Sequence, residues 1–309
     1  MTSGPMDTRS TSGNGHASRD GLWGVVFLAH GSQRGASPAE CSCFWQSGGS
    51  GTPEWCRHCP STPTGLQDAA DRLQISLGQD RARVVLTCLE FIEPHPDQTV
   101  HRMAEQGLSR VVVVPYLLGQ GKHVTLEMDE VLGALRAELP HLRLYLAESL
   151  GPDPRMADIV TERVRAQAEY LPARDQGKPT GVLLVKAGTK NQYDDCVWLE
   201  ELGRMVEMRL GLGYAVAIAQ SHYGDPTVEA GAARLVDDLG VASIIVVPYI
   251  FFPGLILKRN VLGGMDRLQK LYPGVSLAVT PPLGVDDRLV AVAADHIRRV
   301  WDQVENDGT

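Results

Sequence analysis

Three side chains that bind divalent metals or accept protons follow apolar, β-branched runs in this chain. His30 closes VVFLAH, Glu90 closes VVLTCLE, and His123 lies eight positions after the end of VVVVP. Two imidazoles and a carboxylate suit Co²⁺, Fe²⁺, Ni²⁺ or Zn²⁺ better than Mg²⁺, and they supply bases near neutral pH. Any one of the three could equally be an ordinary loop residue, so the prediction depends on all three lying together.

Four cysteines form a second candidate metal site, with the spacing C-x-C, twelve residues, then C-x-x-C. They are Cys41, Cys43, Cys56 and Cys59. Four thiolates can hold Zn²⁺ or an iron–sulfur cluster, His58 could replace one of them, and loop cysteines without a metal are a third interpretation. The other two cysteines, Cys88 and Cys196, lie singly in apolar stretches. The pattern is therefore unlike a secreted disulfide framework.

The two halves of the chain repeat one pattern of strands. The matched pairs are VVFLAHGS (25–32) with LLVKAGT (183–189), VVLTCLEFIEP (84–94) with VAIAQSHYGDP (216–226), and VVVVPYLLGQGKHV (111–124) with IIVVPYIFFPGLIL (244–257). Helices are expected between and after the strands, at 64–78, 96–107, 124–139, 192–211, 226–239, 258–272 and 286–304. This alternation predicts an α/β protein with two tandem doubly wound parallel-sheet lobes.

The lobes and their boundaries follow from the repeat. We expect a disordered tail at 1–20, an N-terminal lobe at 21–172, a linker at 173–181 and a C-terminal lobe at 182–305. Ligands of such sheets bind at the carboxyl ends of the strands, so the active site is expected in the cleft between the lobes.

The repeat also locates an insertion. His30 and Glu90 are 60 positions apart, whereas their counterparts Ala187 and His222 are 35 apart. The surplus of 25 residues contains the four cysteines, so we expect a Cys-rich insert at about 36–62. The counterpart of His123 is Ile256. Because the second half keeps one titratable group of the three, the N-terminal lobe is expected to carry the active site.

Three motifs resemble those of a known family. They are L-A-H-G-S at 28–32, L-E followed four residues later by a proline, and V-V-P-Y-x-L-x-x-G-x-H ending at His123. Together they resemble the class II chelatases, in particular the long two-lobed sirohydrochlorin cobaltochelatase/ferrochelatase family, over residues 22–300 apart from the insert. The resemblance implies that His30 and His123 bind the metal and act in catalysis, and that Glu90 is the active-site glutamate.

The implied substrate, sirohydrochlorin, is rich in carboxylates, whereas the chain has a net charge of −8. Local cations are therefore needed, and the candidates for substrate binding are Arg34, Lys122, Lys258 and Arg259; each could also be an ordinary surface cation. Apolar side chains of the second lobe could pack the flat macrocycle or belong to the core. They are Phe251, Phe252, Leu255 and Ile256.

The composition narrows the class of protein. The acidic balance and the lack of basic runs argue against nucleic-acid binding, and no apolar run is long enough to cross a membrane. We expect a cytoplasmic enzyme, a monomer or a homodimer, that inserts Co²⁺ in preference to Fe²⁺ without ATP, in cobalamin or siroheme biosynthesis. The alternatives are a chelatase for nickel or another tetrapyrrole, and a non-catalytic metal- or tetrapyrrole-binding protein whose cysteines sense redox state.

Overall fold

The computed structural model describes residues 21–31, 62–90, 93–119, 128–171, 177–188, 196–254 and 256–307. The strands in these ranges are β1 (Trp23–Ala29), β2 (Ala82–Cys88), β3 (Arg110–Pro115), β4 (Arg143–Leu146), β5 (Thr180–Lys186), β6 (Tyr214–Gln220), β7 (Ser243–Tyr249) and β8 (Ser276–Val279). The helices are α2 (Thr62–Leu77), α3 (Pro96–Glu105), α4 (Met128–Glu138), α5 (Pro154–Ala168), α6 (Val197–Leu210), α7 (Val228–Ala233), α8 (Gly263–Leu271) and α9 (Asp287–Asp307). Two π-helical segments, η4 (Arg234–Asp238) and η5 (Ile256–Leu262), continue α7 and precede α8.

The strands form two parallel four-stranded sheets with the same topology. The order is β2-β1-β3-β4 in the first sheet and β6-β5-β7-β8 in the second. The central strands are mostly apolar, because both faces of a parallel sheet are covered by helices; every residue of β1 and of β5 is buried, including Lys186 at the end of β5. The fold class expected from the sequence, two tandem doubly wound α/β lobes, is confirmed.

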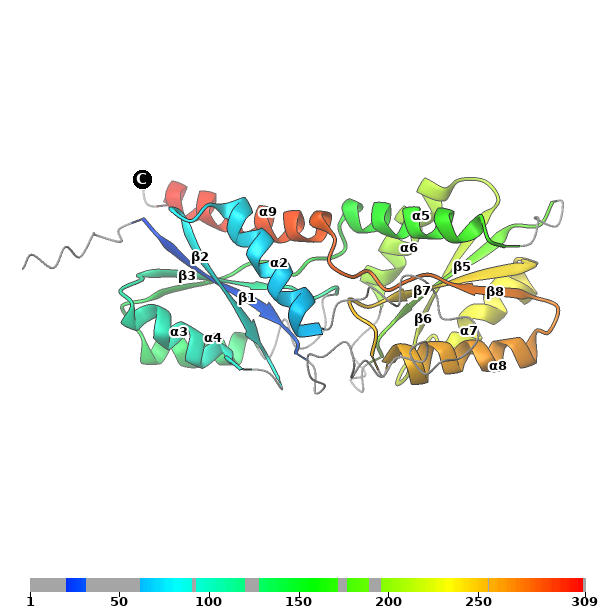
Figure 1. Cartoon of the computed structure of the whole chain (residues 1–309), viewed down its shortest axis with the longest axis horizontal. Coiled ribbons are helices and arrows are strands. Elements are labelled where there is room, and N and C mark those ends of the chain that lie inside the picture. Colours follow the sequence, from blue (N-terminus) through cyan, green and yellow to red (C-terminus); the bar gives the residue numbers. More distant parts are fainter. Residues whose placement is uncertain are drawn as a thin grey trace, which may run out of the picture.

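The two lobes exchange their last helices. α5 follows β4 of the first sheet but packs against α6 and β7 of the second lobe, and α9 follows β8 of the second sheet but packs against α2 and β3 of the first. Figure 1 shows α9 over the sheet of β1–β4 and α5 over the sheet of β5–β8. One hydrophobic core therefore runs through both lobes on this side, from Trp23 and Trp301 to Tyr249.

Polar contacts join the two exchanged helices to each other and to the first sheet. The guanidinium of Arg155 on α5 donates to Asp295 on α9 at 2.6 Å and to Asp153 at 2.9 Å. The Nδ1 atom of His296 on α9 lies 2.9 Å from the carbonyl oxygen of Glu148, just after β4. These contacts hold the helices at the centre of the molecule.

The seven helices expected from the sequence are present as α2, α3, α4, α6, α7 with η4, η5 with α8, and α9. α5 was not expected. Its signals are Asp153, which accepts a hydrogen bond from the backbone N–H of Arg155, and Pro154 in the first turn. None of the described helices is long and apolar enough to span a membrane.

Candidate active site

His30 and Glu90 are held side by side at the carboxyl edge of the first sheet. Ala29 and Cys88, the last residues of β1 and β2, are partners in the ladder. The ladder continues beyond both strands, because the backbone N–H of Glu90 donates to the carbonyl oxygen of His30 at 3.0 Å. Both side chains are exposed, so they are placed to meet a ligand at this edge.

Gly31 makes this close approach possible. Its φ is +91°, and a Cβ added to it would lie 1.9 Å from the carbonyl oxygen of Glu90. A larger residue would therefore push apart the two loops that carry His30 and Glu90, and would adopt a backbone conformation that favours glycine. The glycine of the HGS motif is required by this contact.

The imidazole of His30 has a nearby acceptor on the backbone. Its Nδ1 atom lies 3.4 Å from the carbonyl oxygen of Gly31. A proton donated from Nδ1 leaves Nε2 with the lone pair that a metal ion needs.

The third predicted residue of this set, His123, lies outside the described residues, as do Arg34, Lys122 and the four cysteines at 41–59. The described chain does reach the beginning of the His123 loop. The backbone N–H of Tyr116, directly after β3, donates to the carbonyl oxygen of Leu28 at 2.7 Å. The loop toward His123 thus leaves from the strand next to β1, on the side opposite β2.

The second lobe repeats the backbone geometry but changes the chemistry. The N–H of Ser221 donates to the carbonyl oxygen of Lys186 at 2.9 Å, as Leu89 does to Ala29 in the first lobe. A Cβ at Gly188 would lie 1.2 Å from the carbonyl oxygen of His222. His222 therefore occupies the place of Glu90, as the repeat predicts.

The environment of His222 is positive. Burial and then the charge of Lys186 lower the pKa of His222 below its ordinary value. Its Nδ1 lies 2.7 Å from the Ser221 hydroxyl. The charge of the neighbouring Lys186 disfavours a second metal cation at this position.

Lys258 and Arg259, two predicted substrate-binding residues, lie on η5 after β7. Lys258 is half-buried and Arg259 is exposed. The side chains of Lys258 and Arg259 make no ion pair within the described part of the chain. The segment after β7 thus carries two positive charges, at Lys258 and Arg259.

The aromatic residues after β7 pack against the first lobe. The ring of Phe251 stacks on that of Tyr116, with centroids 4.8 Å apart and an interplanar angle of 13°. The ring of Phe252 lies against Gly65 on α2, where an added Cβ would be 2.4 Å from Cε1. Of the two interpretations of these aromatic residues, the structure favours a packing role between the lobes.

A second contact between a ring and a glycine joins the same two lobes. The indole of Trp198 on α6 lies against Gly119, in the loop after β3, and a Cβ there would be 2.3 Å from its Cζ2. Counted back from the carboxyl ends of α2 and α6, Gly65 corresponds to Trp198. Counted forward from the two Val-Pro-Tyr sequences, Gly119 corresponds to Phe252. The carboxyl ends of both sheets therefore meet at an interface in which two rings of the second lobe lie against two glycines of the first.

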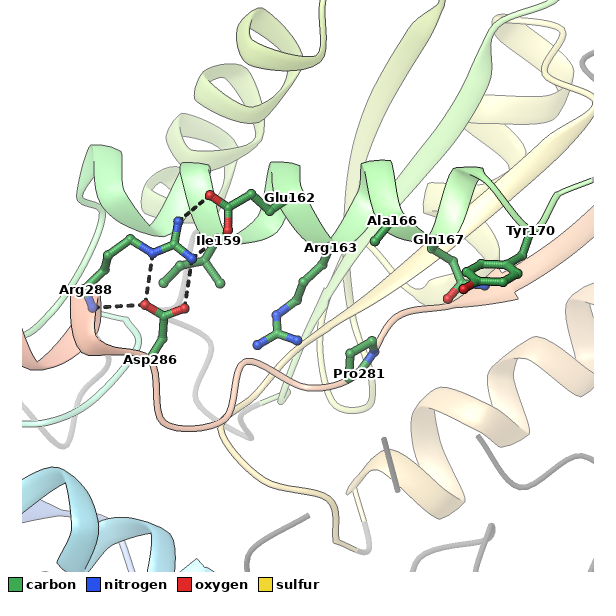
Figure 2. A pocket seen from close by; sticks show the side chains of 9 residues that line it. All are labelled: Ile159, Glu162, Arg163, Ala166, Gln167, Tyr170, Pro281, Asp286 and Arg288. Atoms are coloured by element: carbon green, nitrogen blue, oxygen red, sulfur yellow. Dashed lines mark hydrogen bonds and ion pairs between the residues drawn. The ribbon is translucent and has the colours of Figure 1, made fainter. Parts of the chain in front are cut away.

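A separate cavity lies away from this edge, between α5 and the segment after β8. Its volume is about 440 Å³, and its lining consists of Ile159, Glu162, Arg163, Ala166, Gln167, Tyr170, Pro281, Asp286 and Arg288. Figure 2 shows Arg288 bridging Asp286 and Glu162, while Arg163 points toward the segment that carries Pro281. The cavity contains none of the predicted site residues. Among the described residues, no group of three or more His, Cys, Asp or Glu is placed to hold a metal.

Sequence reasoning missed Lys186 and Trp198. Lys186 is 5% exposed and ends β5, and its ammonium lies 6.0 Å from the centre of the Trp198 ring. The available signal was a lysine closing an otherwise apolar strand, LLVK, where the first half has alanine.

Comparison with known proteins identifies the relatives of this chain. The CbiX family model matches residues 56–167 and 181–300. The chain is 24% identical over 173 residues to a sirohydrochlorin ferrochelatase of Priestia megaterium, and the match covers 55% of this chain and 61% of that protein. The chain thus spans less than two thirds of that relative's length.

Two solved structures share the fold over nearly the whole chain. SirB from Bacillus subtilis with Fe³⁺ has a TM-score of 0.64 and 16% identity, covering 92% of this chain and 98% of its own. The sirohydrochlorin chelatase SirB from Bacillus subtilis subspecies spizizenii in complex with cobalt has a TM-score of 0.63 and 14% identity, covering 92% and 97%.

Proposed function

The chain belongs to the CbiX family, and we propose that it is a sirohydrochlorin chelatase that inserts a divalent metal ion into the macrocycle without ATP. We favour Co²⁺ as the metal substrate, with Fe²⁺ second; curated relatives include both sirohydrochlorin cobaltochelatases and sirohydrochlorin ferrochelatases. The observation that carries the proposal is the hydrogen bond that holds His30 and Glu90 together at the carboxyl edge of the first sheet.

The chemistry assigns a separate task to each side chain. Insertion requires a group that holds the metal ion and a base that accepts the pyrrole N–H protons. The imidazole of His30 supplies a neutral nitrogen ligand, with His123 as the proposed second ligand. The carboxylate of Glu90 accepts protons as the macrocycle takes up the ion. No G-x-x-x-x-G-K-[ST] motif for nucleotide binding occurs in the chain.

The lobe interface supports the position of the macrocycle. The loops after β3 and β7 both leave toward it, and Lys258 and Arg259 on η5 add positive charge for the carboxylates of the substrate. Arg34 and Lys122 are proposed to do the same from the first lobe. A cytoplasmic location and a metal or cluster at Cys41, Cys43, Cys56 and Cys59 remain predictions.

The decisive experiment is anaerobic incubation of the protein with sirohydrochlorin and Co²⁺ or Fe²⁺, following the absorbance of the product. We expect His30→Ala to abolish the enzymatic rate, and Glu90→Gln to lower the rate while metal binding persists. His141→Ala is the matched control, because His141 is exposed in the turn before β4, at the amino edge of the sheet. It should keep the wild-type rate.

Two outcomes would count against the proposal. A wild-type rate no higher than that of metal and sirohydrochlorin alone would remove the enzyme assignment. Tight binding of the tetrapyrrole without insertion would indicate instead a non-catalytic binding protein.

A further inference from the structure

The cavity between α5 and the segment that follows β8 contains an arginine without a carboxylate partner. Nη2 of Arg163 donates to the carbonyl oxygen of Leu283 at 2.7 Å, and Arg163 makes no other hydrogen bond and no ion pair with the described residues. Its Nε is buried and has no hydrogen-bond partner there. Since a guanidinium has five N–H donors, most of those on Arg163 are not used by the described chain.

Both carboxylates that line the cavity are bound by a second arginine. Arg288 donates from Nη1 to Glu162 at 2.7 Å and from Nε to Asp286 at 2.9 Å, as Figure 2 shows. Burial lowers the pKa of Arg163, although the charges of Asp286 and Glu162 oppose this shift. Because a charge withdrawn from water is normally paired, Arg163 indicates an anionic partner that the described residues do not supply.

The cavity is large enough for a small molecule. Its volume of about 440 Å³ lies in the range of ligand pockets, roughly 300 to 1,000 Å³. Beside the guanidinium of Arg163 the lining includes the apolar side chains of Ile159, Ala166 and Pro281, and the ring of Tyr170, which is 81% exposed. The lining therefore suits a molecule with one anionic group and an apolar body.

The wall opposite α5 is held in place by the neighbouring backbone. The N–H of Leu283 donates to the carbonyl oxygen of Ile250 at 2.9 Å, and that of Gly284 to Phe251 at 2.7 Å. The carbonyl oxygen of Leu283, on the same segment, accepts the hydrogen bond from Arg163. The position of the guanidinium is thus largely fixed before a ligand binds, as in most small-molecule sites.

The charges of the lining select the anion. Glu162 and Asp286 balance Arg163 and Arg288, so the empty cavity is neutral at pH 7. A monoanion adds one negative charge, whereas a phosphate dianion adds two beside two carboxylates. The planar guanidinium of Arg163 also matches the geometry of a carboxylate. A monocarboxylate is therefore favoured over phosphate.

We propose that this cavity binds a small monocarboxylate, with its carboxylate on Nη1 of Arg163 and its apolar body against Ile159 and Pro281. The site contains neither His30 nor Glu90, and it does not depend on the proposed chelatase function. The ligand contacts α5, which follows the first sheet, and the segment that leads into α9, which follows the second. Its binding therefore stabilises the exchanged arrangement of the two lobes.

The test is a titration of the full chain with benzoate and with 3-phenylpropionate, followed by saturation-transfer NMR of the probe. We expect saturable binding and a rise in Tm with probe concentration. Arg163→Met should raise the Kd about tenfold, as for loss of a charge-assisted hydrogen bond. Benzamide, which has the same ring without the charge, should bind about tenfold more weakly than benzoate.

Arg165→Met is the matched control, because it removes an exposed arginine of the same helix that does not line the cavity; it should leave the Kd unchanged. Ala166→Phe fills the cavity from an exposed position and keeps the guanidinium, so it decides the question if Arg163→Met does not fold. It should also raise the Kd about tenfold.

Three results would overturn the proposal. They are the absence of saturable binding of both carboxylates to the wild-type protein, a wild-type Kd in the folded Arg163→Met or Ala166→Phe variant, and tighter binding of inorganic phosphate than of either carboxylate. None of these results bears on metal insertion, so the proposed function is tested separately.

Discussion

At the scale of single residues, the candidate site depends on how closely two loops approach. Gly31 lets the carbonyl oxygen of Glu90 occupy the space where a side chain would begin. Gly78, at the end of α2, has a similar φ of +82° but has no atom within 4 Å of its potential Cβ. Comparing substitutions at Gly31 and Gly78 therefore separates the energetic effect of a positive φ from the effect of the contact with Glu90.

We therefore predict that Gly31→Ala lowers the free energy of unfolding by several kcal/mol, whereas Gly78→Ala lowers it by about 1 kcal/mol. Gly31→Ala should also abolish metal insertion, because the His30 and Glu90 loops move apart. Urea denaturation and the chelatase assay measure the two effects. Equal losses in the free energy of unfolding in the two variants would show that the contact between Gly31 and Glu90 does not contribute to stability.

The sequence was most informative about residues that end strands. His30 and Glu90 were predicted because each closes an apolar run, and parallel strands bring such ends to one edge. Lys186 was missed although it also ends a strand. Trp198 was not predicted, because its contact with Gly119 joins segments that are far apart in the sequence.

At the scale of elements, the lobes interlock through rings that lie against glycines. A Cβ at Gly65 on α2 would be 2.4 Å from Phe252, although alanine is favoured over glycine inside a helix by about 1 kcal/mol. The contact and the helix propensity thus act in opposite directions at this position.

We predict that Gly65→Ala destabilises the wild-type protein but stabilises the Phe252→Ala variant, by about 1 kcal/mol in the second case. A double-mutant cycle in urea measures both effects. The same sign in both backgrounds would contradict the packing of Phe252 on α2.

Most strands and helices could be predicted from the sequence, but which helices pack against one another could not. Alternating apolar runs and amphipathic segments indicated the strands and seven helices. α5 was missed although Asp153 and Pro154 mark its start, since the repeat was counted as ending with β4. That α5 packs on α6, and α9 on α2, depends on tertiary contacts between segments far apart in the sequence.

At the scale of the whole molecule, the exchanged helices make the lobes interdependent. Trp301 of α9 is 2% exposed, and its ring centroid lies 5.8 Å from that of Trp23 on β1. Removing α9 from the first lobe would expose one face of its sheet, and removing α5 would do the same to the second.

We predict that residues 1–174 and 175–309, produced as separate chains, do not fold alone but assemble when produced together. Each fragment contains the helix that covers the sheet of the other. Circular dichroism and size-exclusion chromatography of the single and mixed fragments measure this. Cooperative thermal unfolding of either fragment alone would contradict the prediction.

The exchange also sets the order of events during synthesis. Domains commonly fold as they leave the ribosome, the amino-terminal one first. Here β1–β4 and α2 are complete long before residues 287–307 of α9 are made. Until then, Trp23 lacks its partner Trp301, and we expect the part of the first sheet that α9 covers to stay open to solvent and to other unfolded chains.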